Sequence, residues 1–458
     1  MNKVCLQFKR TVGPLKNLQG VNCGPVSYSG LLDISNLFTA ISVPLIRLHD
    51  TNWPHPREVD YYTIFPDFDK DPSDPENYHF ETTDQYMKEC IATGANIVFR
   101  LGVSIEHANQ KFYVKPPKDF NKFADICLGI VRHYTEGWAD GWNCKEVSYW
   151  EIWNEPDLKV GFGRTHLPSP TWMGTPEEYF KLYEIVSKKL KKYNSSLKIG
   201  GPAIAYVDTE FFDDFLNYVE AHQLPMDFFS WHCYTSDVLK VRKQANKIRD
   251  RLDKMGYTHT ESHLNEWSYV PPGTSFGKMF APGMDGENRT KMHQQLQGEQ
   301  GAAYSAAFMT LLQKEPVDET MFFCASTLNT LSLFNMYGQP QAVYYPFYYM
   351  AQLCKLGNLT GIQIPEEGKG LFYLSACNPA TRSYGVLVTN YGGRAETIRL
   401  ETDLPADISG TMAVYCTDKE SVCSKALMHA SKTLELQIKE FSVVYIEILT
   451  EEDYPFGV

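Results

Sequence analysis

The sequence predicts an α/β protein in which a (β/α)8 barrel of the TIM type is followed by an antiparallel β-sandwich. Strand-like and helix-like segments alternate along residues 13–357, with strands near 20, 46, 98, 151, 199, 230, 263 and 322. After about residue 358 this alternation gives way to short strands separated by turn residues. Alternating strands and helices indicate a parallel sheet, and eight such units favour a closed barrel over a doubly wound sheet.

The domain organisation follows from the same change of pattern. We predict a catalytic barrel over residues 13–357 and an accessory β-sandwich over residues 358–458, with residues 1–12 as a candidate further strand of the sandwich. A chain of 458 residues has room for both units. Hydrophobic residues make up 43% and charged residues 21%, which is typical of a globular protein with a large core.

The composition also argues against several classes of binding partner. The formal net charge is -12 and no basic run is present, which argues against a nucleic-acid partner. No segment approaches the ~20 apolar residues of a membrane span, so no membrane association is expected. No GxGxxG or P-loop pattern occurs, and we expect no cofactor. Homo-oligomerisation is left open.

Cysteine usage and the first residues predict the compartment. The chain has 11 cysteines without a CxxC pair, and free thiols in a reducing compartment are the simplest interpretation. Residues 1–9 lack the uninterrupted apolar stretch of a signal peptide, so a cytoplasmic location is expected.

The individual elements are predicted from periodicity and from turn and capping signals. The helix over 176–193 has the strongest signal, because Thr175 is a natural N-cap, Pro176 suits the first helical position and Glu178 completes a capping box. The predicted barrel strands are 18–22, 44–50, 95–101, 147–155, 197–202, 227–234, 258–267 and 319–325. The predicted helices are 86–92, 120–134, 176–193, 209–222, 238–255, 298–313 and 346–356. The predicted sandwich strands are 371–375, 384–390, 396–400, 410–416, 433–438 and 442–448.

The fourth barrel strand has an unusual end. Pro156 cannot donate to a sheet, so we predict that the strand ends with Glu155 as its last residue. A carboxylate there, beside Asn154 and near Trp153, suits sugar chemistry, because aromatic faces exclude water and raise the pKa of an acid. The alternative is an ordinary strand-to-helix turn whose carboxylates are solvated.

Polar side chains gather at the ends of several predicted strands. Since the active site of such a barrel lies where its strands end, these side chains are expected to meet at one rim. Two of them are glutamates, and hydrolysis of a glycoside needs such a pair of carboxyl groups. The strand-end residues are Arg47, His49, Asn154, Glu155, His232, Tyr234, Asn265, Glu266 and Trp267.

Four of these strand ends resemble motifs of a known enzyme family. Trp153-Asn154-Glu155-Pro156 resembles the acid/base motif of clan A glycoside hydrolases. His263-Leu264-Asn265-Glu266-Trp267 resembles the nucleophile strand of their family 39, which holds β-xylosidases and α-L-iduronidases. The segments 47–49 and 230–234 resemble that family's motifs on strands two and six. The resemblance covers essentially the whole chain, and a barrel with a β-sandwich is also the family's arrangement.

The resemblance implies a role for each matching residue. Glu155 would be the general acid/base and Glu266 the nucleophile, and no metal would take part. Asn154 would bond the sugar 2-hydroxyl, Tyr234 would orient Glu266, and His49 and His232 would contact other hydroxyls. Arg47 and Trp267 complete the expected substrate-binding set. Two departures concern sugar specificity: Asp50 follows His49, and residues 321–326 contain no tryptophan as a stacking platform.

The expected function is that of a retaining glycoside hydrolase acting on a terminal bond of a glycoside or oligosaccharide through a covalent intermediate. A β-D-xylosidase is the first choice that the resemblance implies. An α-L-arabinofuranosidase or another exo-glycosidase of the family is the close rival, and an iduronidase is less favoured. A non-catalytic carbohydrate-binding barrel and a transglycosylase are the hypotheses from other classes.

Other acidic and histidine residues have structural interpretations that we favour. Glu151 lies deeper than Glu155 and is expected to pair with Arg47 or Arg100. Glu261 lies too deep in its strand to replace Glu266 as nucleophile. His259 and His263 would lie about 13 Å apart on a strand, which argues against a metal site.

Overall fold

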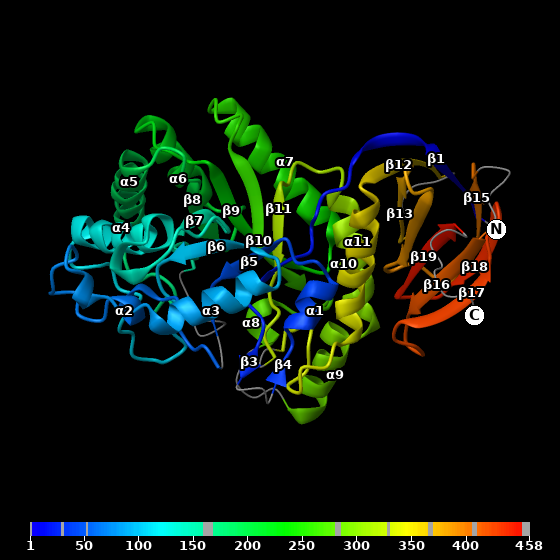
Figure 1. Ribbon diagram of the computed structural model, residues 1–458, viewed down its shortest axis with the longest axis horizontal. Coiled ribbons are helices and arrows are strands. Elements are labelled where there is room, and N and C mark those ends of the chain that lie inside the picture. Colours follow the sequence, from blue (N-terminus) through cyan, green and yellow to red (C-terminus); the bar gives the residue numbers. More distant parts are fainter. Residues whose placement is uncertain are drawn as a thin grey trace.

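The computed structural model describes residues 2–28, 32–51, 54–158, 168–279, 285–327, 330–364, 370–404 and 410–450. Figure 1 shows a barrel surrounded by helices, with a separate sheet beside it. The predicted fold class, a (β/α)8 barrel with an accessory β-sandwich, is confirmed.

Eight parallel strands close the barrel in the order β10-β11-β2-β5-β6-β7-β8-β9. Each contains or adjoins one of the positions predicted from the sequence, so all eight predicted strands exist. They are β2 (Gly20–Asn22), β5 (Leu45–Leu48), β6 (Asn96–Leu101), β7 (Val147–Ile152), β8 (Ile199–Ile204), β9 (Phe228–Thr235), β10 (Glu261–Tyr269) and β11 (Glu319–Phe322).

A helix follows each strand and covers the barrel from outside. The clearest local signal lies in α5, where the Thr175 side chain accepts from the Glu178 amide and the Glu178 carboxylate accepts from the Thr175 amide. The eight helices are α1 (Ser35–Ala40), α3 (Glu81–Ala92), α4 (Phe120–Glu136), α5 (Pro176–Tyr193), α6 (Glu210–Ala221), α7 (Val238–Lys254), α10 (Glu299–Leu312) and α11 (Tyr345–Leu356).

Short elements occupy the connections. They are β3 (Ser27–Tyr28), β4 (Leu32–Asp33), α2 (Tyr61–Ile64), α8 (Phe276–Met279), α9 (Gly286–Gln297) and the 3-10 helices η1 (Pro75–Asn77), η2 (Trp138–Asp140) and η3 (Ala342–Tyr344). Within the described ranges, no helix combines the length and the apolar character needed to cross a membrane.

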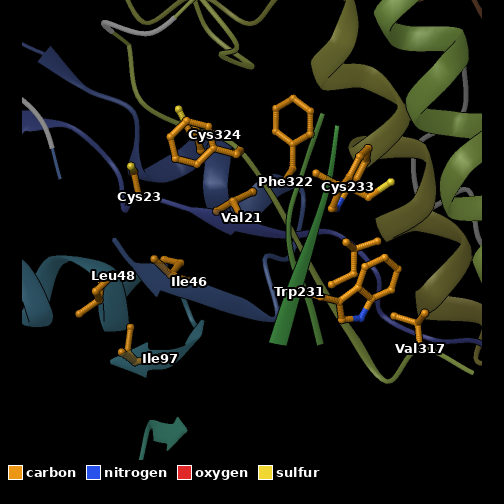
Figure 2. Packing of buried hydrophobic residues seen from close by; sticks show 14 of the residues in the cluster. Val21, Cys23, Ile46, Leu48, Ile97, Trp231, Cys233, Val317, Phe322 and Cys324 are labelled. Atoms are coloured by element: carbon orange, nitrogen blue, oxygen red, sulfur yellow. The ribbon is translucent and has the colours of Figure 1, made fainter. Parts of the chain in front are cut away.

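Side chains alternate between the two faces of the barrel wall. Figure 2 shows Ile46 and Leu48 of β5, and Trp231 and Cys233 of β9, among the buried apolar side chains. These residues lie two apart on their strands, and the intervening positions hold Arg47 and His232. Because successive residues of a strand point to opposite faces, Arg47 and His232 point into the barrel.

The second unit is a sheet of nine strands in the order β17-β16-β19-β14-β13-β12-β1-β15-β18. All neighbours are antiparallel except β1 and β15, which pair in parallel, so the sheet is mixed where the sequence predicted a purely antiparallel one. Strands from both halves of the sheet contribute to one hydrophobic core. The strands are β1 (Asn2–Pro14), β12 (Asn358–Gln363), β13 (Leu371–Asn378), β14 (Ser383–Asn390), β15 (Glu396–Thr402), β16 (Gly410–Thr417), β17 (Ser424–His429), β18 (Thr433–Ile438) and β19 (Ser442–Thr450).

The sheet packs on the barrel through α10 and α11, which lie between the two units (Figure 1). Tyr349 of α11 stacks on Tyr445 of β19 with ring centroids 5.4 Å apart. Tyr391 follows β14, and its hydroxyl donates to the Ser236 carbonyl at 2.6 Å. The accessory sheet therefore supports the loop between β9 and α7, at the end of the barrel where the candidate residues lie.

Candidate active site

A cavity of about 870 Å³ opens at the carboxyl ends of the barrel strands. Four of the nine strand-end residues line it: Glu155, His232, Tyr234 and Glu266. Its remaining wall comes from residues at or beyond the ends of β6, β7, β8, β9, β10 and β11, from Lys240 and Gln244 of α7, and from Lys278 of α8. The structure thus brings the two predicted catalytic glutamates to one cavity, although 111 positions separate them in the sequence.

Glu155 lies on a tight turn beyond β7. The strand ends at Ile152, so the prediction that Glu155 is its last residue is wrong. The turn replaces extended backbone, because Trp153 has φ 71° and Glu155 has φ 46°. The Glu155 amide donates to the Ala203 carbonyl at 2.9 Å, which ties the turn to β8. Such strained backbone persists where its surroundings hold it and is common at functional sites.

Glu266 reaches the cavity through a bulge in β10. In the pairing with β9, Leu264 lies opposite Trp231 and Glu266 lies opposite His232, which leaves Asn265 as an extra residue. A bulge changes the alternation of side chains. Asn265 and Glu266 therefore both face the interior, where the Asn265 amide donates to Glu151 and Glu266 contacts Arg47.

The two catalytic candidates lie close together around His232. A carboxylate oxygen of Glu155, one of Glu266 and a ring nitrogen of His232 all lie within 4.8 Å of one another. His232 Nδ1 is 2.9 Å from Glu155 Oε1 and 3.4 Å from Glu266 Oε2. Burial lowers the pKa of His232 to about 4, so the imidazole between the two carboxyl groups is neutral at pH 7.

The two carboxyl groups have different electrostatic surroundings. Burial raises the pKa of Glu155 to about 8, which leaves this group largely protonated at neutral pH. Burial and the neighbouring Glu155 raise the pKa of Glu266, and the Arg47 guanidinium and the Tyr234 hydroxyl act in the opposite direction. The Arg47 guanidinium is 2.8 Å from Glu266 Oε1, and the Tyr234 hydroxyl donates to Oε2 at 2.6 Å. These contacts favour an ionised Glu266 beside a protonated Glu155, the division of roles that acid catalysis with a nucleophile requires.

Arg47 lies beneath the site and is not exposed to it. Its side chain is fully buried and does not line the cavity, so the expectation that it binds substrate is corrected to a positioning role. The guanidinium donates to Glu151 at 2.6 Å, to Glu266 at 2.8 Å and to Asn154 Oδ1 at 2.7 Å, and it also donates to Asn22 at 3.1 Å. The predicted pairing of Glu151 with Arg47 is confirmed, and Arg100 pairs with Asp60 instead.

Several buried polar atoms around the glutamates have no hydrogen-bond partner among the described residues. They are both ring nitrogens of His49, Nδ2 of Asn154 and Nε2 of His232. Burial and nearby cationic side chains lower the pKa of His49 well below its usual range, so this ring is neutral too. Buried polar atoms are rarely left unpaired, and Nε2 of His232, which lines the cavity, is suited to bond a polar ligand.

Trp267 is a packing residue, and the expectation that it contacts substrate is wrong. Its side chain is 0% exposed and stacks on Phe308 of α10 with ring centroids 4.1 Å apart. The bulge at Asn265 explains this orientation. Regular alternation from the inward-facing His263 would point Trp267 inward, whereas the extra residue turns it outward.

Among the described residues, the grouping of Glu155, His232 and Glu266 has the spacing to hold a metal ion. The Arg47 guanidinium already neutralises Glu266 at 2.8 Å, and its positive charge disfavours a second cation there. His263, the other histidine of interest, stacks on Phe228 and bonds Glu261 at the far end of β10.

Sequence reasoning missed several residues of the cavity wall. Tyr206, after β8, is 55% exposed and lines the cavity. Phe323, after β11, lines it at the strand where a tryptophan was sought. Lys240 and Gln244 come from the first turns of α7. Tyr206 and Phe323 follow directly after barrel strands, and that position is the signal that could have identified them.

Comparison with known proteins gives consistent results. Residues 59–255 match the family model described as Glycosyl hydrolases family 39. A beta-xylosidase from Geobacillus stearothermophilus is 35% identical over 208 residues, which make up 41% of this chain and 37% of that protein. The match therefore spans little more than a third of that relative's length.

Solved structures resemble the chain over almost its whole length. A glucosidase from Croceicoccus marinus superposes with a TM-score of 0.78 at 24% identity, covering 98% of this chain and 99% of that one. A monomeric beta-xylosidase from Caulobacter crescentus superposes with a TM-score of 0.71 at 15% identity, covering 98% and 100%. These likenesses support the fold of both units.

Proposed function

We propose that the chain is a member of glycoside hydrolase family 39, whose model matches residues 59–255, and that it is a retaining glycoside hydrolase, a β-D-xylosidase that removes a terminal xylosyl residue. One observation carries the proposal. Carboxylate oxygens of Glu155 and Glu266 lie within 4.8 Å of each other. This spacing is close to the ~5–5.5 Å of retaining enzymes and shorter than the ~6.5–9.5 Å that leave room for water in inverting ones.

In the first step, Glu266 acts as the nucleophile. Its carboxylate attacks the anomeric carbon while the bond to the leaving oxygen breaks, and Glu155 gives its proton to that oxygen. Arg47 and Tyr234 hold the two oxygens of Glu266 in place. The raised pKa of Glu155 supports its role, because the acid must be protonated when substrate binds.

In the second step, Glu155 acts as the base. It is now ionised and takes a proton from a water molecule, whose oxygen attacks the anomeric carbon and releases Glu266. Two displacements at one carbon restore the original configuration. Nε2 of His232, which lines the cavity, is suited to bond a sugar hydroxyl throughout, whereas Asn154 and His49 are buried and do not line it. Hydrogen bonds to the sugar that tighten as the sugar ring flattens would stabilise the transition state.

The test is release of nitrophenol from aryl glycosides by the wild type and by Glu266→Gln. The panel holds the β-D-xyloside, the α-L-arabinofuranoside, the β-D-glucoside and the β-D-galactoside, and the β-xyloside is expected to have the highest kcat/KM. Glu266→Gln should lose several orders of magnitude. Glu261→Gln, on the same strand but bonded to Tyr149 at the opposite end of the barrel, is the matched control.

Stereochemistry gives an independent check. Proton NMR during hydrolysis of the β-xyloside should show β-xylose first, before mutarotation. First appearance of α-xylose would contradict the retaining mechanism. Glu155→Ala should be reactivated by azide with formation of the β-glycosyl azide, because azide attacks the covalent intermediate without needing a base.

We also propose that the protein is located in the cytoplasm, a reducing compartment. All 11 cysteines are free thiols, and seven of them are buried. Free thiols are typical of reducing compartments. Cell fractionation tests the location, and recovery of the protein outside the cell would contradict it.

A further inference from the structure

The cavity extends beyond the two glutamates to a second polar wall. Lys240 and Gln244 of α7, Asp208 before α6, and Lys278 of α8 line it there. A volume of about 870 Å³ is near the top of the ~300–1,000 Å³ range of small-molecule pockets. The cavity therefore has room for a leaving group beside the sugar ring that is cleaved.

Gln244 is a buried polar side chain that faces this space. It is 6% exposed, and its Oε1 has no hydrogen-bond partner among the described residues. Its Nε2 donates to Asp208 Oδ2 at 3.4 Å, which fixes the amide with its oxygen unpaired. A buried amide oxygen without a donor is uncommon, and a ligand hydroxyl would satisfy it.

Two lysines give this wall its charge. Lys240 lies four residues before Gln244, so both side chains are on one face of α7. In the described part of the chain, no ion pair engages Lys240 or Lys278. The neighbouring acids have other partners: Asp208 pairs with Lys247 at 3.1 Å, and Asp237 accepts from the Leu239 amide as the N-cap of α7.

The turn that carries the proposed acid/base is bonded to the segment after β8, which contributes Asp208 to this wall. The Asp157 carboxylate, two residues after Glu155, accepts from the amides of Ala205 and Tyr206 at 2.9 and 3.0 Å. Residues 205–209 line the cavity, and Asp208 among them bonds Gln244. Hydrogen bonds therefore connect the acid/base turn, through residues 205–209, to the wall that holds Gln244.

We propose that this wall is a leaving-group subsite for a carboxylate. Lys240 and Lys278 bind the carboxylate of an acidic leaving group, and Gln244 Oε1 accepts a hydrogen bond from a hydroxyl beside it. A uronic acid residue and an aromatic acid both supply this chemistry. The inference rests on the proposed function, because a leaving group exists only if the chain cleaves glycosides.

Two matched substrate pairs test the subsite. The first is the β-D-xyloside of 4-hydroxybenzoate with that of its methyl ester. The second is a xylosyl uronic acid disaccharide with its methyl ester. For each pair, the ratio of kcat/KM for the acid over the ester is measured. Comparing this ratio between the wild type and the variants isolates the effect of the substrate's carboxylate charge. In the wild type it should fall as salt rises, since partly exposed charges are screened.

The variants are Lys240→Met, Lys278→Met and the double variant. The double variant should lower the acid-to-ester ratio by about five- to twentyfold, as expected for two partly exposed ion pairs. The acid-to-ester ratio of the double variant should no longer depend on the salt concentration. Lys254→Met is the matched control, because it lies on the same α7 helix about 21 Å further along and should keep the wild-type ratio.

The outcomes separate the two levels of the proposal. Cleavage of the esters with an unchanged acid-to-ester ratio in the double variant would overturn the subsite and leave the glycosidase function intact. A lysine-dependent ratio in either pair supports the subsite, and the pair that responds identifies the source of the carboxylate. Failure of the wild type to cleave any glycoside would overturn the proposed function and the subsite with it.

Discussion

Replacement of Arg47 by methionine is the most informative perturbation of the site. Arg47 is fully buried and bonds Glu151 at 2.6 Å and Glu266 at 2.8 Å. Methionine fills similar space but leaves both carboxyl groups without their cation. Breaking a buried ion pair from one side costs roughly 3–5 kcal/mol. We therefore expect the free energy of unfolding of Arg47→Met to fall by about that amount.

The same change should alter the pH profile of catalysis. Arg47 lowers the pKa of Glu266, so without it a higher pH is needed to ionise the nucleophile. The acidic limb of kcat/KM should therefore move to higher pH. Urea unfolding followed by fluorescence gives the stability, and hydrolysis of an aryl β-xyloside across pH gives the profile.

A double variant separates the effect of Arg47 on stability from its effect on catalysis. In Arg47→Met with Glu151→Gln, one unpaired carboxyl group is gone, so about 1–3 kcal/mol of the lost stability should return. Glu266 still lacks Arg47, so the displaced acidic limb should persist. A loss below about 1 kcal/mol in Arg47→Met, together with an unmoved limb, would refute the reasoning.

Three further predictions concern neighbouring residues. With the pKa of Glu155 raised to about 8, kcat/KM should fall as pH rises through about 8, and a pH profile of Glu155→Gln should lack this limb. Tyr234→Phe removes the donor 2.6 Å from Glu266, so assays should show kcat/KM reduced by about 10–100-fold. Trp267→Ala should lower the free energy of unfolding by about 3–5 kcal/mol in urea. Its KM should stay unchanged, and a raised KM at full stability would contradict the packing role.

The fold was largely predictable because its signals are local. The helix over Pro176–Tyr193 has the bounds that the sequence predicts, since its N-terminus carries a capping box. By contrast, α3 begins at Glu81, five residues before its predicted start, and its N-cap Phe80 makes no side-chain bond. Strand β17 was not predicted, because every residue in it is exposed and no apolar alternation marks it.

Only part of the candidate site was predictable from its residues, and its geometry was not. Two glutamates at strand ends can be recognised in a sequence, whereas the positive φ of Trp153 and the bulge at Asn265 depend on bonds to neighbouring strands. The bulge alone decides that Trp267 turns away from the cavity. The four bonds of Arg47 join β5 to β2, β7 and β10 and their ends, and no local pattern predicts such a network.

The placement of β1 has a consequence for the order in which the protein can assemble during synthesis. In the sheet, β1 lies between β12 and β15, and Leu6 pairs with Ile362, 356 residues later. At ~5–20 residues per second, β1 waits roughly 20–70 s for this partner to leave the ribosome. The barrel strands can close during that interval, whereas the sheet cannot be completed. Deletion of residues 1–12 would leave the edges of β12 and β15 unpaired, and unpaired edges invite association between chains.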